Sequence, residues 1–201
     1  LRNTRIETKN AIEEITGKSL EFYELDAKNS VEVAKKIGTI DGTIHFAALK
    51  SVGESIQKPM EYYTENLESL LSIIKVSATS GAKSFIFSSS ATVYGETEEE
   101  CVNEETLLGT PLNPYGHTKS LGEQILKSGM HPFKTILLRY FNPVGAHPSA
   151  KIGELPNGIP NNLVPYITQT AAGLREKLTV FGSDYDTRDG SCIRDFIHVV
   201  D

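Results

Sequence analysis

Short apolar runs alternate with longer segments of helical spacing between residue 6 and residue 141. The runs at residues 43–49, 84–88 and 135–141 are apolar at consecutive positions and predict buried strands, while residues 20–25 alternate as a shorter strand does. Segments with helical spacing occupy residues 6–15, 31–37, 56–80 and 115–126. Strands that alternate with helices in this way predict an α/β fold with a doubly wound parallel sheet covered on both faces.

The pattern changes after Asn142. Proline, glycine and asparagine are frequent over residues 143–160, and this composition predicts a long loop. Further on, we expect a helix at residues 163–174, a short strand near residues 178–181 and a last strand at residues 196–200. The residues after Asn142 therefore belong to a region that differs from the alternating segment before it.

Composition and charge exclude several classes of protein. The 201 residues, 39% hydrophobic and 23% charged, can bury the core of one ordinary domain or somewhat more. The 26 acidic residues outnumber the 20 basic ones and no basic cluster occurs, so binding of nucleic acid is not expected. No stretch approaches the roughly 20 apolar residues of a membrane-spanning helix. Cys101 and Cys192 lie too far apart for a disulfide framework or a zinc site, which favours a reducing, cytoplasmic location.

The residues that follow each long apolar run are informative, because ligands of a doubly wound sheet bind beyond the carboxyl ends of its strands. Residues 46–50 include small side chains that let a ligand approach the backbone closely. Serines at residues 88–90 end the second long run, and Tyr140, Phe141 and Asn142 end the third. Three such strand ends in succession predict a ligand site along this edge of the sheet.

Tyr115 and Lys119 are four residues apart in a predicted helix, so their side chains project from the same face. The reference pKa of a phenol is about 10, and a nearby ammonium lowers it. A pKa near 7 requires roughly 4 kcal/mol of differential stabilisation, which exceeds what one lysine supplies in water. A cationic cofactor ring would supply much of the remainder. The pair alone is a weak signal, but Ser90, at a strand end 25 residues upstream, makes a general base the favoured interpretation.

Five segments that include these residues resemble the extended short-chain dehydrogenase/reductases, and within them the branch that epimerises UDP-sugars at C4. The segments are residues 88–95 (SSSATVYG), 113–119 (NPYGHTK), 139–148 (RYFNPVGAHP), 158–166 (GIPNNLVPY) and 194–201 (RDFIHVVD). They keep the order and spacing of the family, and the resemblance extends from Leu20 to the last residue. The form of the first segment differs from that of the sugar-nucleotide dehydratases, which carry an Asp-Glu pair after a threonine.

The resemblance implies a role for each matching residue. Tyr115 would be the general base for the sugar 4-hydroxyl, Lys119 would hold the nicotinamide ribose and lower the pKa of Tyr115, and Ser90 would bind the same sugar oxygen. The positions that match NAD contacts are Asp26, Ala27, Phe46, Ala47, Ala48, Lys50, Asn66, Tyr115, Lys119 and Phe141. Those that match contacts with the UDP-sugar are Ser90, Tyr115, Asn142, Asn162, Leu163, Thr179, Val180, Phe181 and Arg194. No metal is implied.

The activity implied by the resemblance is reversible epimerisation at C4 of UDP-glucose and UDP-galactose, through a 4-keto intermediate and with tightly bound NAD, in galactose metabolism. Another UDP-sugar, N-acetylated, uronic or pentose, is an alternative substrate. A third possibility is a regulator that binds NAD without catalysis, although Ser90, Tyr115 and Lys119 are all present. The family also implies a homodimer formed through the helices at residues 56–80 and 115–126.

The resemblance divides the chain in two. Residues 1–142 match a partial NAD-binding, Rossmann-like domain without its first strand and glycine-rich turn, and residues 143–201 match part of the UDP-sugar-binding region. The final strand is a candidate for returning to the main sheet. We interpret the sequence as a fragment of a longer protein, and we expect these 201 residues to be inactive alone.

Overall fold

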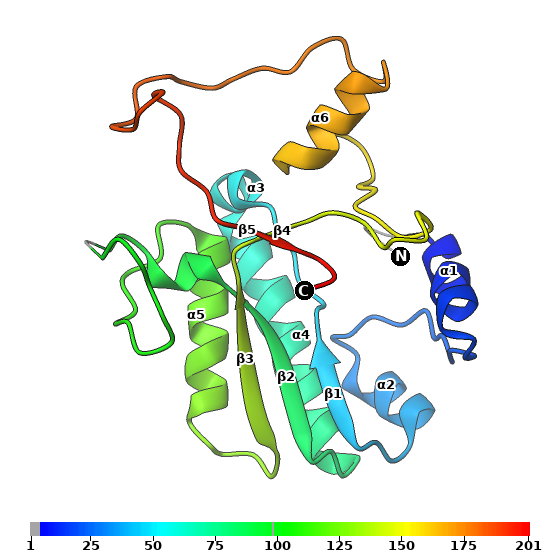
Figure 1. Cartoon of the computed structure of the whole chain (residues 1–201). Coiled ribbons are helices and arrows are strands. Elements are labelled where there is room, and N and C mark those ends of the chain that lie inside the picture. The colour runs from blue at the N-terminus through cyan, green and yellow to red at the C-terminus, as the bar shows by residue number, and fades with distance from the viewer. Residues whose placement is uncertain (1–4, 98) are drawn as a thin grey trace. The chain divides into compact units, whose positions relative to one another are not determined.

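Three parallel strands form the centre of the fold in the computed structural model, which describes residues 5–97 and 99–201 (Figure 1). In spatial order they are β1 (Gly42–His45), β2 (Ser84–Ser90) and β3 (Lys134–Tyr140). The register places Ile86 of β2 between Ile44 of β1 and Ile136 of β3. The three long apolar runs thus form strands as predicted, and their parallel pairing confirms the α/β class.

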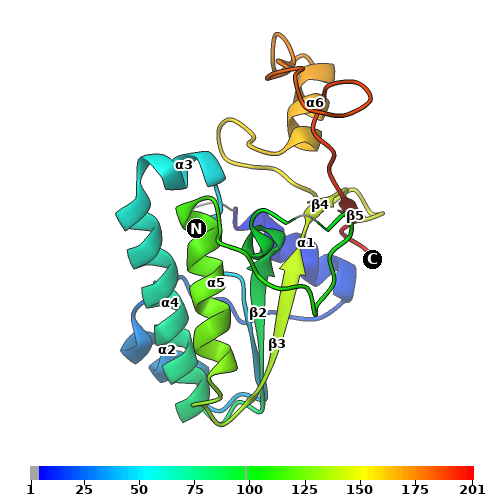
Figure 2. The ribbon, with the colours of Figure 1, turned by 90° about the vertical axis from the view of Figure 1, so that its left-hand side faces the viewer.

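Helices lie before and between these strands. They are α2 (Ser30–Ile37), α3 (Val52–Gln57), α4 (Pro59–Thr79), the short 3-10 helix η1 (Ala91–Tyr94) and α5 (Pro114–Lys127). Figure 2 shows α4 and α5 side by side on one face of the sheet. The core lies between these two helices and the sheet, and its buried members are Leu70, Phe85, Phe87, Leu126 and Phe133.

The opposite face of the sheet differs from the expectation of cover on both sides. The strands advance in one direction, from β1 through β2 to β3, and right-handed crossovers then place both connecting helices on the same face. On the other face, Ile44 is 62% exposed and Ile136 is 48% exposed. In the part of this unit that the structure describes, the sheet is therefore covered on one face.

The predicted helix at residues 56–80 is two helices. Lys58, between α3 and α4, has φ −130° and ψ 55°, outside the helical region. It precedes Pro59, whose ring disfavours a helical conformation at the residue before it and which instead begins α4. The start of α5 has a similar design, because Asn113 accepts a hydrogen bond from the Gly116 amide and Pro114 follows as the first helical residue.

Two predicted strands are absent from the described residues. Neither residues 20–25 nor residues 178–181 belong to a strand, although both contain apolar side chains. A strand exists only as part of a ladder, and the three-stranded ladder of the described chain ends at β1 and β3. At residues 178–181, Val180 and Phe181 are 75% and 87% exposed, so burial does not favour a strand there either.

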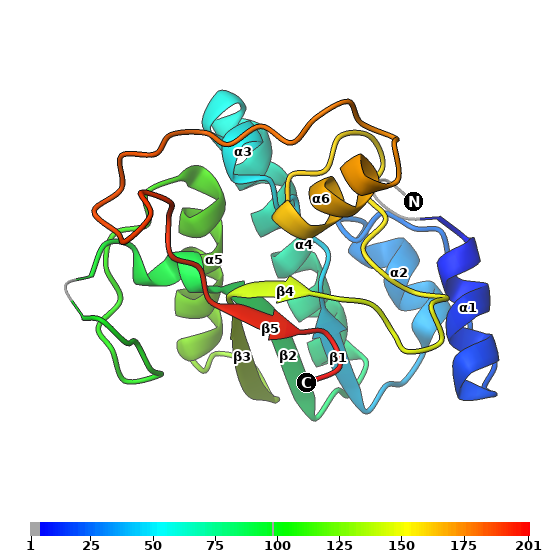
Figure 3. The same cartoon turned by 45° about the horizontal axis from the view of Figure 1, so that its top comes forward.

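The chain forms two compact units, one of residues Leu25–Tyr140 and the other of the residues up to Glu24 together with Phe141–Asp201. The second unit contains α1 (Glu7–Thr16), β4 (Asn142–Val144), α6 (Leu163–Ala171) and β5 (Phe196–His198). Strands β4 and β5 pair in parallel as a two-stranded sheet of their own, which Figure 3 shows. Among the described residues, no helix combines the length and apolar content needed to cross a membrane.

Candidate active site

The fold brings Ser90, Tyr115 and Lys119 together at the carboxyl end of β2. Ser90 is the last residue of β2, and Tyr115 and Lys119 lie on consecutive turns of α5, which packs against that strand. Ser90 and Lys119 are 8% and 4% exposed. The structure therefore assembles the three predicted catalytic side chains within one unit.

Ser90 is oriented by the turn that follows it. Its Oγ accepts hydrogen bonds from the backbone amide of Thr92 at 3.3 Å and from the Thr92 hydroxyl at 3.0 Å. The proton of the Ser90 hydroxyl is then left to donate to Tyr115. Burial raises the pKa of Tyr115 above its ordinary value, and the hydrogen bond from Ser90 opposes that rise without cancelling it.

Lys119 is held as a buried ammonium. Its Nζ donates to the carbonyl oxygen of Ser88 at 2.6 Å and lies 5.8 Å from the centre of the Tyr115 ring. Burial lowers the pKa of Lys119 to about 8, so the side chain keeps its charge at neutral pH. The protein's own groups still leave Tyr115 as a phenol, and a further positive charge beside its ring is needed to favour the phenolate.

His45 lies close to these groups but does not act as an acid. It is buried at the end of β1, with its ring 6.1 Å from and nearly parallel to that of Phe87. Burial, with a smaller effect of the Lys119 charge, lowers its pKa to about 4. The side chain is therefore neutral at physiological pH, as expected of a histidine that belongs to the core.

The segment after β1 is fixed by hydrogen bonds to the side chain of Asn66 in α4. The Asn66 side chain accepts a hydrogen bond from the Leu49 amide at 2.7 Å and donates to the Leu49 carbonyl at 3.1 Å. It also donates to the Thr118 hydroxyl of α5 at 3.0 Å. Phe46, 62% exposed, stacks against Tyr140 with 6.4 Å between ring centres. The predicted cofactor contact of Asn66 is thus a side chain whose polar atoms already bind the protein.

The other predicted cofactor residues lie in this segment and in a turn before β1. Ala47 and Lys50 are exposed and Ala48 is half-buried, so this segment is accessible from solvent. Asp26 is exposed, and its Oδ1 accepts a hydrogen bond from the Lys28 amide at 2.9 Å in a tight turn that includes Ala27.

The remaining predicted residues lie in the other unit. Asn142 on β4 donates from Nδ2 to the carbonyl oxygen of Asp195 at 2.6 Å. The exposed Arg194 comes just before Asp195, two residues ahead of β5. Phe141 precedes β4 and is 39% exposed. Four further positions are surface residues: Asn162 and Leu163 at the start of α6, and Thr179 and Val180 in an irregular segment that continues to Phe181.

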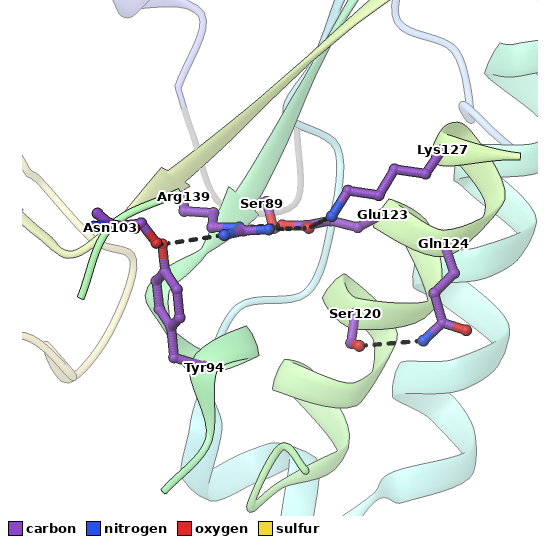
Figure 4. A network of polar contacts seen from close by, with 8 residues as sticks. All are labelled: Ser89, Tyr94, Asn103, Ser120, Glu123, Gln124, Lys127 and Arg139. Atoms are coloured by element: carbon purple, nitrogen blue, oxygen red, sulfur yellow. Dashed lines mark hydrogen bonds and ion pairs between the residues drawn. The ribbon is translucent and has the colours of Figure 1, made fainter. Parts of the chain in front are cut away.

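A buried ion pair behind the candidate site was missed by sequence reasoning. Glu123 of α5 accepts hydrogen bonds from Arg139 of β3 through two guanidinium nitrogens, at 2.9 and 2.8 Å (Figure 4). The signal was present in the sequence. Glu123 stands four residues after Lys119, and Arg139 is a charge inside an otherwise apolar strand.

The sequence of the whole chain is similar to one family. It matches the model of the NAD dependent epimerase/dehydratase family over residues 2–201. The UDP-glucose 4-epimerase of Bacillus subtilis is 49% identical over 100% of this chain and 60% of its own length. The human UDP-glucose 4-epimerase is 46% identical over 97% of this chain and 58% of its own length. The chain thus spans about 60% of the length of the curated relatives it matches.

Solved structures of the same family are similar in fold. A UDP-glucose 4-epimerase from Bifidobacterium longum in complex with NAD⁺ and UDP matches 99% of this chain and 61% of its own, with a TM-score of 0.94 and 46% identity. The enzyme from Stenotrophomonas maltophila, with bound NAD and formylated UDP-arabinopyranose, has a TM-score of 0.92 and 43% identity over 99% of this chain and 60% of its own.

Proposed function

The chain belongs to the NAD dependent epimerase/dehydratase family, and from that premise we propose that the complete protein interconverts UDP-glucose and UDP-galactose by inverting C4 of the sugar. The observation that carries this proposal is the grouping of Ser90, Tyr115 and Lys119 at the end of β2. Removal of a proton from an alcohol requires a general base. A buried phenol can act as that base when a hydroxyl donor and an ammonium beside it favour its phenolate form.

Each of the three residues has a separate task in the proposal. Tyr115 takes the proton from the sugar 4-hydroxyl at its Oη and later returns it. Ser90, with its oxygen held by Thr92, donates a hydrogen bond that favours the phenolate and orients the sugar oxygen. Lys119 contributes a fixed positive charge close to the phenol ring.

The surface beyond β1 has the chemistry that a dinucleotide needs. Residues 46–48 are accessible from solvent, Phe46 offers an exposed aromatic face, and Asp26 offers an exposed carboxylate in a tight turn. We assign NAD binding to these residues, together with Ala27, Lys50, Asn66, Tyr115, Lys119 and Phe141. When bound, NAD supplies the acceptor and donor of hydride for the reaction, and its positive charge favours the Tyr115 phenolate.

We assign the UDP-sugar to the residues of the other unit and to the catalytic group. Arg194 has the planar fork that binds pyrophosphate oxygens, and Asn142 lies on β4, which pairs with the strand that begins two residues after Arg194. The further substrate residues in this proposal are Asn162, Leu163, Thr179, Val180 and Phe181. Residues 1–142 would then form a partial NAD-binding domain and residues 143–201 part of the UDP-sugar-binding region.

The proposal is tested on the complete purified protein with UDP-galactose and no added NAD. We expect UDP-glucose to form without accumulation of NADH, because the cofactor stays bound and is regenerated in each turnover. Absence of product from UDP-galactose, with turnover of an N-acetylated, uronic or pentose UDP-sugar, would contradict the hexose assignment while keeping the reaction type.

A Tyr115→Phe variant separates the enzyme from a regulator that only binds NAD. The variant keeps the aromatic ring and loses the proton acceptor, so we expect turnover to fall by about 100-fold or more while bound NAD is retained. If wild-type protein carried NAD but turned over no UDP-sugar, and the variant were indistinguishable from it, we would conclude that the protein is a regulator.

Three further assignments complete the proposal. The complete protein is a cytoplasmic homodimer that uses the outer surfaces of α4 and α5, where Leu71 is 51% exposed and Tyr63 and His117 bridge the two helices at 2.8 Å. It binds no nucleic acid, in line with its net charge of −6. The 201-residue chain alone does not retain NAD; a stable 1:1 complex of that chain with NAD, seen by native mass spectrometry, would contradict this.

A further inference from the structure

Glu123 is a buried carboxylate with every acceptor position used. Its side chain is fully buried, and it receives hydrogen bonds from the Ser89 hydroxyl at 2.6 Å and from Lys127 at 3.0 Å. Arg139 adds two more in a forked arrangement. Burial by itself would raise the pKa of Glu123, but the bonds from Arg139, Ser89 and Lys127 lower it to about 2. The carboxylate is therefore a permanent charge, matched by donors from three elements.

The ion pair extends to the loop beyond β2. The third guanidinium nitrogen of Arg139 donates to the Tyr94 hydroxyl at 3.1 Å, and that hydroxyl donates to the carbonyl oxygen of Asn103 at 2.9 Å (Figure 4). The guanidinium also lies 5.0 Å from the centre of the Tyr94 ring. One arginine thus joins β3 to α5 and to η1, which directly follows Ser90.

The end of β2 interacts with α5 at three successive residues. Hydrogen bonds join the Ser88 carbonyl to Lys119 and the Ser89 hydroxyl to Glu123, and the next residue, Ser90, lowers the pKa of Tyr115. The first and last pairs contain the three proposed catalytic side chains, and the middle one is the link to the buried ion pair. Since Tyr115, Lys119 and Glu123 recur every four residues on α5, they share one face of that helix.

We propose that Glu123 and Arg139 are positioning residues for the proposed reaction: their forked pair, with Ser89, fixes α5 against the ends of β2 and β3 and so holds Ser90, Tyr115 and Lys119 in reactive alignment. This inference rests on the proposed epimerase function. Neither residue touches the reacting atoms, because both lie behind the strand end. A misplacement of about 1 Å at a reacting group is enough to lower turnover by about 100-fold.

The diagnostic variant is Glu123→Gln in the complete, NAD-loaded protein. Glutamine keeps the size of the side chain but cannot accept both forked hydrogen bonds from Arg139. We expect kcat for UDP-galactose to fall by about 10- to 100-fold with KM nearly unchanged, because alignment and not binding is lost. The acidic limb of the kcat–pH profile should move to higher pH as Ser90 and Lys119 support the Tyr115 phenolate less well.

The direction of that pH shift excludes a simple charge effect. Removal of the negative charge at Glu123, acting through space alone, would favour the Tyr115 phenolate and move the acidic limb to lower pH. A shift to lower pH, or no shift with unchanged kcat, would overturn the positioning role. Lys127→Gln is the matched control, since it removes a partner of the same carboxylate that reaches neither β2 nor β3, and we expect wild-type kinetics from it.

A double variant separates positioning from stability. Glu123→Met with Arg139→Met replaces the buried pair by apolar side chains, a change that often preserves or raises stability where loss of one partner lowers it. We expect its unfolding midpoint to return towards the wild-type value while kcat remains lowered by about 10-fold or more. Recovery of kcat together with the midpoint would overturn the inference and leave the pair a purely structural role.

The activity of the wild-type protein distinguishes a failure of the proposed function from a failure of the positioning role. If wild-type protein turned over no UDP-sugar, the proposed function would fail before any variant was compared. If wild-type protein were active and Glu123→Gln had wild-type kcat and the wild-type pH profile, only the positioning role of Glu123 and Arg139 would fail.

Discussion

The side-chain amide of Asn66 binds both backbone polar groups of Leu49, accepting from its N–H at 2.7 Å and donating to its C=O at 3.1 Å. An amide can form this reciprocal pair because it carries a donor and an acceptor side by side, as a neighbouring strand does. Leu49 is buried, so its backbone groups have no water in place of Asn66. The segment after β1 is thereby fixed to α4 without pairing with a neighbouring strand.

Asn66→Asp is expected to loosen the segment after β1. The carboxylate can accept from the Leu49 amide but cannot donate to the Leu49 carbonyl or to Thr118, so two acceptors lose their donor and face a negative charge. The loss of unfolding free energy should be about 1–3 kcal/mol, measured by urea titration. The NAD content of the purified complete protein should also fall. Full NAD occupancy in a destabilised variant would show that Asn66 supports the fold and not the cofactor segment.

Glu123 should make the free energy of unfolding decrease as the pH falls in the acidic range. Its pKa is about 2 in the folded chain and near the ordinary value of 4.5 in the unfolded chain, so its contribution is complete above pH 4.5 and is lost as the pH falls towards 2. The difference corresponds to about 3 kcal/mol at 1.36 kcal/mol per unit. Denaturant unfolding between pH 2 and pH 6 should show this slope in the wild type, and Glu123→Gln should flatten it. Parallel slopes for the two proteins would contradict the assignment.

Much of the sheet unit can be predicted from local pattern, because its strands lie where apolar residues are consecutive. Residues 84–88 and 135–141 predict β2 and β3 closely for this reason. Residues 20–25 fail, because alternation describes a strand's preference but a ladder needs a partner strand beside it. The predicted helix at residues 56–80 fails at Lys58, where the proline that follows decides the backbone locally.

The grouping of the proposed catalytic residues could be predicted from the sequence, but the contacts that support them could not. Tyr115 and Lys119 are visible because a single helix sets their spacing. Apart from Lys127 on the same helix, the partners of Asn66 and Glu123 are 16 to 52 residues away in sequence, and only the folded chain decides which donor meets which acceptor. The resemblance predicts a cofactor contact for Asn66, but it could not reveal that the Asn66 amide binds the Leu49 backbone.

Gly122 should tolerate no side chain at the contact between α4, α5 and the sheet. A Cβ there would lie 2.7 Å from the Phe87 ring and 3.0 Å from Leu70, both in the buried core. We expect Gly122→Ala to cost about 1–3 kcal/mol of unfolding free energy despite the better helix propensity of alanine. Gly53→Ala in α3 is the matched control, because nothing lies within 4 Å of its Cβ, and it should be neutral or stabilising. Equal midpoints for the two variants would contradict close packing at Gly122.

Lys119→Met should stabilise the folded chain, and in the complete protein it should abolish the proposed epimerase turnover. The pKa of Lys119 is about 8 in the folded chain and near 10.5 when unfolded, so at pH 7 the buried ammonium costs about 3 kcal/mol. Its hydrogen bond to the Ser88 carbonyl returns about 1 kcal/mol, which leaves a net gain of about 2 kcal/mol for methionine. Urea unfolding of the cofactor-free protein at pH 7 measures this gain, and turnover of UDP-galactose should be lost.

The gain from Lys119→Met should also shrink as the pH rises. Below pH 8 both states carry the charge and the folded state bears its full cost. Between pH 8 and pH 10.5 the folded state has released the proton while the unfolded state still holds it, so the wild type becomes more stable relative to the variant. A difference in unfolding free energy that stayed constant from pH 7 to pH 10 would mean that Lys119 is not a buried charge. A variant less stable than the wild type at pH 7 would mean that the Ser88 hydrogen bond outweighs the burial, and that the lysine is retained for stability and not for the chemistry of Tyr115.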